Sequence, residues 1–197
     1  MEHRIHKTVV KTVLIWILIL SNNPIFSEQE EVLPPTIIKY LEGVPGEATQ
    51  FGFMLGDWAS EITVYSPDGS VVTQVEGKRT GKFLFNKRMF MDELVTYSKQ
   101  TGRELTSTVN LRSFNPHDKQ WEVVFLDANQ AQTVNRFTGT KVGDEIHLSE
   151  LSDNVTAKLR YFDITQNSFS WEMMVTQDGQ DWWRQYSGKE IKENKDR

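Results

Sequence analysis

The 197-residue sequence contains no cysteine. This absence excludes a disulfide framework, a thiolate metal site and a cysteine nucleophile. The signatures of several enzyme classes are missing as well, because the sequence has no G-x-S-x-G nucleophile motif, no G-x-G-x-x-G dinucleotide motif and no Walker loop. The sequence therefore contains no motif that indicates a particular reaction. Without disulfides, its fold must be stabilised by a hydrophobic core alone.

Basic residues are scattered along most of the chain rather than clustered. The sequence holds 22 Lys and Arg against 27 Asp and Glu, a net charge of −5. Without residues 1–27, which carry three basic groups and one acid, 19 basic and 26 acidic groups remain, a net charge of −7. Nucleic acids and anionic membrane surfaces are bound by clustered Lys and Arg. We therefore expect neither as a partner of the mature chain.

The N-terminus reads as a signal for export. Residues 1–11 carry three basic groups, and residues 12–20 form the apolar run TVLIWILIL. A run this short falls below the roughly 20 residues that a membrane-spanning helix needs, whereas a secretory signal peptide has this layout. We predict cleavage after Ser27, with Ser21 as a second candidate and an uncleaved anchor as the alternative. The mature protein would then be periplasmic or extracellular.

The composition changes along the chain predict four divisions. They are a signal peptide over residues 1–27, a leader with a short helix over 28–50, a barrel domain over 51–192 and a mixed-charge tail over 193–197. Helical spacing of apolar residues with suitable end residues predicts short helical pieces over 36–43 and 45–55. No pattern for a long helix follows.

From Gly56 onward the apolar residues recur with a period of two. Turn signals separate the runs, among them Pro67-Asp68-Gly69, Asn86-Lys87 and Asp178-Gly179. The pattern predicts nine or ten short antiparallel strands. Large side chains fall on both faces of many strands, which favours a barrel over a sandwich, whose outer faces should be plainly polar. We expect an all-β, up-and-down antiparallel barrel with the N-terminal helical segment closing one end.

The stretch FGFMLGDW marks the passage from helix to strand. We expect Trp58 to pack near one barrel end against the helical segment, through Phe51 and Leu55. Gly56 would permit the sharp bend between the two elements.

These stretches together resemble a known family. FGFMLGDW is similar to the first-strand signature of lipocalin-like, or calycin, barrels. The segments over residues 85–90, 113–127 and 160–183 resemble, in this order, an exported bacterial calycin-type domain of unknown function. The likeness spans Phe51 to Ile191 and departs from the family at Lys87, where Gly is usual, and around Ser113–Asn115. It implies a barrel closed at one end by the helical segment, and it implies no reaction.

The strands carry an unusually rich set of aromatic and arginine residues. A barrel lumen lined by rings and a few guanidinium groups suits a small amphipathic anion. The predicted lumen residues are Arg112, Trp121, Arg160, Trp171, Arg184 and Tyr186. For each ring the alternative is plain core packing, and for each arginine it is an outward, solvated position. The prediction is most specific for Arg160, which we expect to line the lumen with Trp121 and Trp171.

Two histidines follow the predicted signal peptide, and neither has a second histidine at metal-ligand spacing. His117 falls in a turn, and His147 falls on the strand side opposite Ile146 and Leu148. A lone histidine of this kind is weak evidence for axial haem ligation. We therefore predict no metal and no cofactor. Asp153, Asp163 and Glu172 are candidate carboxylates that the sequence does not bring together.

Three functions of different classes fit these observations. The first is an exported barrel that binds a small apolar or amphipathic, possibly anionic, ligand. The second is an enzyme with isomerase-like or hydratase-like acid–base chemistry in the same lumen. The third is a structural or interaction protein whose barrel is filled. A monomer or homodimer is expected in each case.

Overall fold

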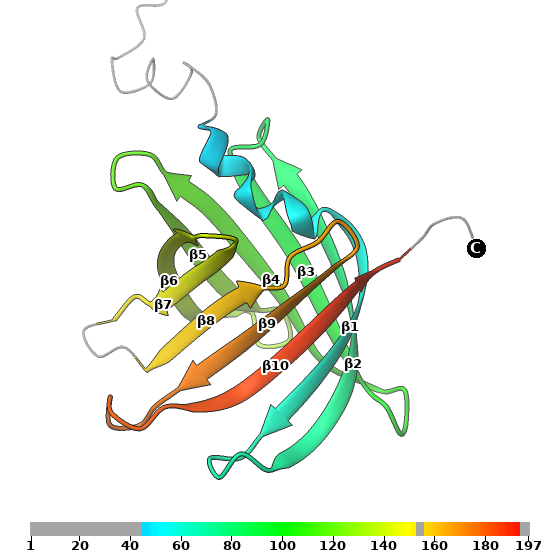
Figure 1. Ribbon diagram of the computed structural model, residues 1–197. Coiled ribbons are helices and arrows are strands. Elements are labelled where there is room, and N and C mark those ends of the chain that lie inside the picture. Colours follow the sequence, from blue (N-terminus) through cyan, green and yellow to red (C-terminus); the bar gives the residue numbers. More distant parts are fainter. Residues whose placement is uncertain (1–44, 153–155, 194–197) are drawn as a thin grey trace, which may run out of the picture. The chain divides into compact units, whose positions relative to one another are not determined.

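The computed structural model describes residues 45–152 and 156–193. Ten antiparallel strands form a closed barrel, preceded by one 3₁₀ helix (Figure 1). The all-β, up-and-down barrel expected from the sequence is therefore confirmed, at ten strands. The expected signal peptide, the short helix over 36–43 and most of the charged tail lie outside the described residues.

Each strand pairs with its neighbours in sequence, and β1 pairs with β10 to close the barrel. The elements are η2 Gly46–Met54, β1 Gly56–Tyr65, β2 Val71–Leu84, β3 Met89–Ser98, β4 Glu104–Asn115, β5 Gln120–Asp127, β6 Gln132–Val142, β7 Glu145–Glu150, β8 Ala157–Phe162, β9 Ser168–Val175 and β10 Trp183–Lys192. Among the described residues, no helix is both long and apolar enough to span a membrane.

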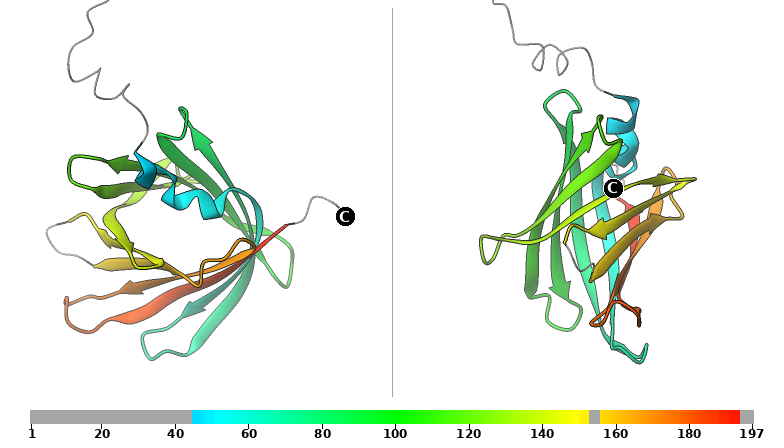
Figure 2. Two further views of the ribbon diagram at one scale, coloured as in Figure 1. Left: turned by 45° about the horizontal axis from the view of Figure 1, so that its top comes forward. Right: turned by 90° about the vertical axis from the view of Figure 1, so that its left-hand side faces the viewer.

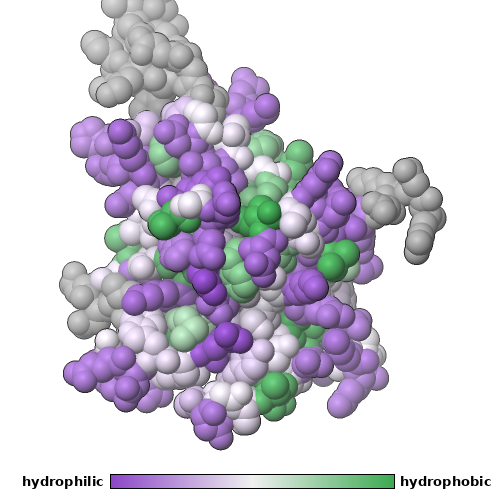
Figure 3. Space-filling model, viewed as in Figure 1, coloured by the Kyte–Doolittle hydropathy of each residue, from purple (hydrophilic) through white to green (hydrophobic). Residues whose placement is uncertain are grey.

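The strands alternate between interior and exterior side chains because successive residues of a strand point to opposite faces. In β2, for example, Val75, Gly77, Arg79 and Gly81 are buried while their neighbours are exposed. The outer face is largely polar, and Figure 3 shows its hydrophobic residues in separate spots on the side displayed. As a result, the buried hydrophobic side chains form one continuous core inside the barrel.

The predicted turns lie between strands as expected, and their chemistry explains their positions. Between β1 and β2, Asp68 accepts a hydrogen bond from the Ser70 backbone N–H at 2.9 Å, and Gly69 has a φ of +84°. Between β9 and β10, Gly179 has a φ of +78°. Between β2 and β3, Asn86 and Lys87 both adopt positive φ, a conformation that Asn tolerates better than most residues.

Helix η2 lies across one end of the barrel (Figure 2). Gly56, with a φ of +99°, takes the chain from the helix into β1. The helix approaches β2 so closely that a side chain on Gly81 would collide with the Met54 carbonyl, at 2.1 Å from its oxygen. Glycine at position 81 therefore allows the helix to sit against the barrel wall.

The contacts of Trp58 match the expectation in part. Trp58 is 0% exposed, and its indole N–H donates to the Met54 carbonyl at 2.9 Å. Phe51 is buried in the same core cluster, but Leu55 is 44% exposed and does not belong to that cluster, so the expected packing role of Leu55 is not met. The reason is the helix type. A 3₁₀ helix has three residues per turn, which places Met54 rather than Leu55 on the face of Phe51.

Candidate functional site

The barrel interior beneath η2 is filled with aromatic rings. We call this part the closed end and define it by Phe51, Trp58, Phe90, Trp121 and Phe169, all 0% exposed. The Phe51 ring meets the Trp121 ring edge-on at 4.7 Å between centroids, and Trp58 meets Phe169 at 5.0 Å. The Trp121 indole N–H donates to Gln50 at 2.9 Å. Edge-to-face packing of this kind stabilises a core beyond the area that it buries.

A layer of buried charges follows beneath the rings. We call it the charged belt, and it consists of Arg79, Asp92, Arg112 and Glu190. Arg79 donates to Glu190 at 3.0 and 3.1 Å and also to Asp92, and Arg112 forms an ion pair with Asp92. The belt thus holds two guanidinium groups and two carboxylates, contributed by strands β2, β3, β4 and β10.

Neutral side chains add hydrogen bonds to the belt, but the Arg112 Nε–H and the Asn110 side-chain oxygen have no partner among the described residues. The Trp171 indole N–H donates to Glu190 at 2.9 Å, and the Ser60 hydroxyl donates to the same carboxylate. Asn110 donates to Asp92 at 2.9 Å, and Arg112 donates to the Tyr161 hydroxyl at 3.1 Å. Because a buried charge is tolerated only when it is paired and hydrogen-bonded, these partners allow the belt to remain ionised inside the core.

The electrostatics of the belt favour this ionised state. Burial by itself would raise the pKa of Asp92, but Arg112 and Arg79 outweigh it and hold the pKa below the usual range. Burial likewise opposes charge on Arg112, and Asp92 nevertheless raises its pKa. The belt thus places two guanidinium groups against two carboxyl groups, and each guanidinium has at least one carboxyl partner. Neither guanidinium is left uncompensated for an anionic ligand.

Beyond the belt the inward-facing side chains are less deeply buried than at the closed end. We call this part the open end and define it by five inward-facing residues, Val64, Phe125, Met173, Val175 and Tyr186, which are all only half-buried. Their inward direction follows from the register, because Tyr186 pairs with Val64 on one side and with Met173 on the other. Polar groups lie between these residues and the belt. Thr96 is buried, and Asn110 is 2% exposed with its side-chain oxygen unpartnered in the described residues.

Four of the six predicted lumen residues point inward. Arg112 belongs to the charged belt, and Trp121 belongs to the closed end. Trp171 and Tyr186 lie further down the interior, on β9 and β10. The prediction that Arg160 and Arg184 line the lumen is wrong. Arg160 pairs with Glu172 on the outer face, while Tyr161 pairs with Trp171 inside. A shift of one residue along a strand exchanges the two faces, and Tyr161 takes the inward position predicted for Arg160.

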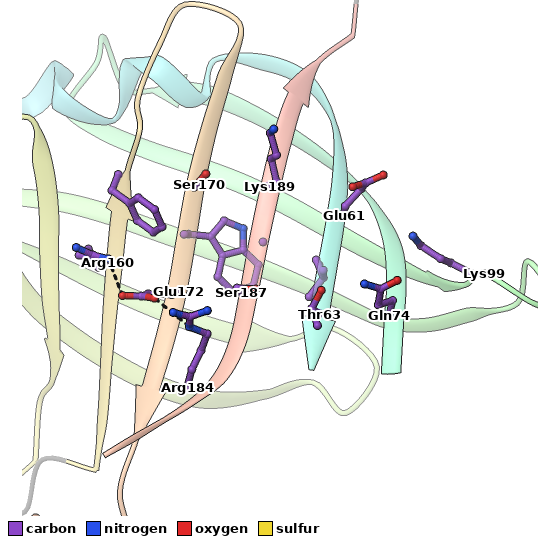
Figure 4. Close-up of a pocket in the computed structure, with 14 residues that line it drawn as sticks. Glu61, Thr63, Gln74, Lys99, Arg160, Ser170, Glu172, Arg184, Ser187 and Lys189 are labelled. Carbon is purple, nitrogen blue, oxygen red and sulfur yellow. Dashed lines mark ion pairs between the residues drawn. The ribbon is translucent and has the colours of Figure 1, made fainter. Parts of the chain in front are cut away.

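Arg160 and Arg184 meet instead on the outer surface. Both form ion pairs with Glu172, at 2.8 and 3.1 Å, so that the carboxylate lies between the two guanidinium groups (Figure 4). These side chains border a cavity of about 460 Å³ on the outside of β8, β9, β10 and β1. We call this cavity the outer groove.

Among the described residues, the two histidines and Asp163 form no metal site. His117 is exposed in a turn beside Asp118, and His147 lies on the outer face 2.7 Å from Glu145. The predicted side of His147, opposite Ile146 and Leu148, is confirmed. Asp163 lies in the loop after β8, and Asp153 falls outside the described residues. Within 45–152 and 156–193, no group of three acidic, histidine or cysteine side chains is placed to hold a metal.

Most of the charged belt is absent from the residues predicted from the sequence. Arg79, Asp92 and Glu190 were not among the predicted residues. One signal was present, because Asp92 stands in phase with the apolar Phe90 and Leu94, and a charge at such a position of a strand points into the core. The same reading applies to Arg79, which alternates with Gly77 and Gly81.

Comparisons with known proteins add evidence on the fold. Neither a protein-family model nor a curated protein matches this sequence. Rv2717c from M. tuberculosis has a similar structure, with a TM-score of 0.57 at 15% identity over 77% of this chain and 100% of that chain. The S-type phycobiliprotein lyase CPES from Guillardia theta has a TM-score of 0.53 at 12% identity over 73% of this chain and 90% of that chain. At such identities the likeness shows a lipocalin-like, calycin-type barrel and no function.

Proposed function

We propose that the protein is an exported binding protein whose open end takes a small apolar or amphipathic molecule. The observation that carries this proposal is the contrast along the interior. Rings seal the closed end, whereas Phe125, Met173 and Tyr186 face inward at the other end and remain accessible to solvent. Inward-facing apolar groups that meet solvent at the mouth of a barrel are typical of a ligand site. The occurrence of a similar barrel in a phycobiliprotein lyase is consistent with small-molecule binding.

The charge balance of the interior favours a ligand whose polar end is neutral. The possibly anionic ligand considered from the sequence would need a free cation, and both buried guanidinium groups are already paired with carboxylates. The polar groups nearest the open end are instead the hydroxyls of Thr96 and Thr106, 2.7 Å apart, and the side-chain oxygen of Asn110. A hydroxyl or amide N–H on the ligand would pair with such acceptors.

The acid–base enzyme considered from the sequence receives less support. A general acid or base needs a carboxyl group that can exchange a proton in the working pH range. Asp92 is ion-paired with two arginines, and its pKa is lowered. Glu190 is held by Arg79, Trp171 and Ser60. These contacts favour a structural role for both groups.

A pair of adjacent methionines provides the test. Met173 faces the interior and Met174 faces outward on the same strand, and both are half-buried. We would titrate the fluorescent probe N-phenyl-1-naphthylamine, which is neutral and apolar, into the parent protein and into Met173→Glu and Met174→Glu. We expect at least a tenfold weaker affinity for Met173→Glu and an unchanged affinity for Met174→Glu, since a carboxylate is costly only where it meets the apolar ligand. Equal affinities in all three proteins would contradict an interior site.

Export forms part of the same proposal and has its own test. The basic N-terminal residues followed by a short apolar run predict that the mature chain starts at Glu28. N-terminal sequencing of the protein collected from outside the cytoplasm should return the residues that begin at Glu28. An intact Met1 in the membrane fraction would contradict cleavage.

A further inference from the structure

The outer groove exists because small side chains lie at its centre and long ones surround it. Thr63 pairs with Ser187, and Ser170 pairs with Lys189, which brings three short hydroxyl side chains together on β1, β10 and β9. Arg160, Arg184, Lys99 and Gln74 extend around them, as Figure 4 shows. The result is a depression with hydroxyl groups on its floor and cationic groups on its rim.

The charge of the groove differs in sign from that of the protein. Its lining includes four cations, Arg160, Arg184, Lys99 and Lys189, and two anions, Glu61 and Glu172. The chain as a whole has a net charge of −5. A local excess of positive charge on an acidic protein attracts anions to that place.

Part of this positive charge is free of internal partners. Glu172 occupies the two arginines, and no ion pair of Lys99 or Lys189 is found within the described residues. The Nε–H of Arg160 is also buried without a hydrogen-bond acceptor there. The two lysines therefore give the groove cationic donors that no carboxylate of the described residues pairs with.

We propose that the outer groove is a second binding site, which takes a small anion carrying several hydroxyl groups, that is, a sugar bearing a phosphate or a carboxylate. The lysines and arginines would contact the anionic group, and the floor of Thr63, Ser170 and Ser187 would exchange hydrogen bonds with the hydroxyls. A cavity of about 460 Å³ exceeds what an inorganic ion fills. The Phe162 ring, stacked under Arg160 at 4.3 Å, gives the rim an apolar surface for the C–H face of a sugar ring.

The test uses the full chain and four probes, which differ in whether they carry a sugar, an anionic group or both. Glucose 6-phosphate, glucuronate, glucose and inorganic phosphate would be titrated by calorimetry and by amide NMR shifts. We expect the two anionic sugars to bind, glucose and phosphate to bind at least tenfold more weakly, and the largest shifts to fall on Ser170, Ser187 and Gly188. If one anionic sugar binds and the other does not, the site is assigned to phosphate or to carboxylate accordingly. No binding of either, or shifts centred on the open end, would overturn the proposal.

Matched charge variants separate a built site from general attraction. Lys99→Gln with Lys189→Gln removes two positive charges from the groove, and Lys82→Gln with Lys141→Gln removes two exposed charges elsewhere on the barrel. We expect at least tenfold weaker binding of the anionic sugar for the first pair and less than a twofold change for the second. Equal weakening in both pairs would mean that net charge alone attracts the anion. Because the groove lies outside the barrel, this result is independent of the Met173 and Met174 comparison.

Discussion

The two ends of the barrel interior are built from the same strands but packed differently. On β9, for example, Phe169 at the closed end is 0% exposed, whereas Met173, two inward positions further along, is half-buried. Helix η2 makes this difference, because it seals one end with Phe51 and Met54 and nothing comparable covers the other end in the described residues. Stability should therefore concentrate at the closed end and the charged belt, and ligand access at the open end.

The largest effect on stability should come from breaking the charged belt. Arg112→Met would leave Asp92 with one guanidinium partner and would remove the contacts of Arg112 with Tyr161 and Phe51. Removing one partner of a buried ion pair destabilises proteins by about 3–5 kcal/mol, and we expect a loss in that range from urea unfolding followed by tryptophan fluorescence.

The control for this change is Arg160→Met on the outer face. Arg160 is 38% exposed, and its ion pairs with Glu172 and Glu145 lie on the outer face of the barrel. Exposed pairs contribute about 0–1 kcal/mol, so the control should unfold almost as the parent does. Similar losses in both variants would mean that the belt is not the buried structural element described above.

Trp58→Ala tests the closed end itself. Trp58 is fully buried against Phe169, and its indole holds the Met54 carbonyl of η2. Replacing a buried large aromatic residue by alanine costs about 3–5 kcal/mol. Leu55→Ala, one residue beyond η2, should change the free energy of unfolding by less than about 1 kcal/mol, since that side chain is exposed. A loss below about 1 kcal/mol for Trp58→Ala would show that η2 does not seal the barrel.

Acid should lower the free energy of unfolding through the charged belt. The pKa of Asp92 is lowered in the folded state, so its contribution to stability is fully present above the pKa of an unfolded Asp, about 4. That contribution is lost as the pH falls below about 4 toward the folded pKa. The free energy of unfolding, measured between pH 6 and pH 2.5, should therefore decline in the acid range. In Asp92→Asn the decline should be shallower, and an equally steep decline would assign it to other carboxyl groups.

The sequence predicted the barrel because each strand carries its own evidence. Period-two alternation and turns such as Pro67-Asp68-Gly69 are local, and local signals survive without knowledge of the partners. The face of Arg160 could not be predicted with the same security, because a shift of one residue exchanges the two faces. The charged belt was even harder to predict from the sequence. Arg79 and Glu190 are 111 positions apart, and only the closure of β1 on β10 and β2 brings them together.

The smallest effect on stability should come from a substitution at the open end. This substitution also distinguishes a barrel that binds a ligand from a barrel whose interior is filled. Tyr186 faces inward between Val64 and Met173 but remains half-buried. Tyr186→Ala should therefore lower the free energy of unfolding by only about 1 kcal/mol, and should weaken binding of N-phenyl-1-naphthylamine at least tenfold, because the ring would form part of the ligand's wall. Urea unfolding and a fluorescence titration on the same sample give both numbers. A loss of about 3–5 kcal/mol, as for a fully buried ring, with unchanged probe binding would mean that the open end is packed like the closed end. The interior would then be a core throughout, and the outer groove would be the better place to look for a ligand.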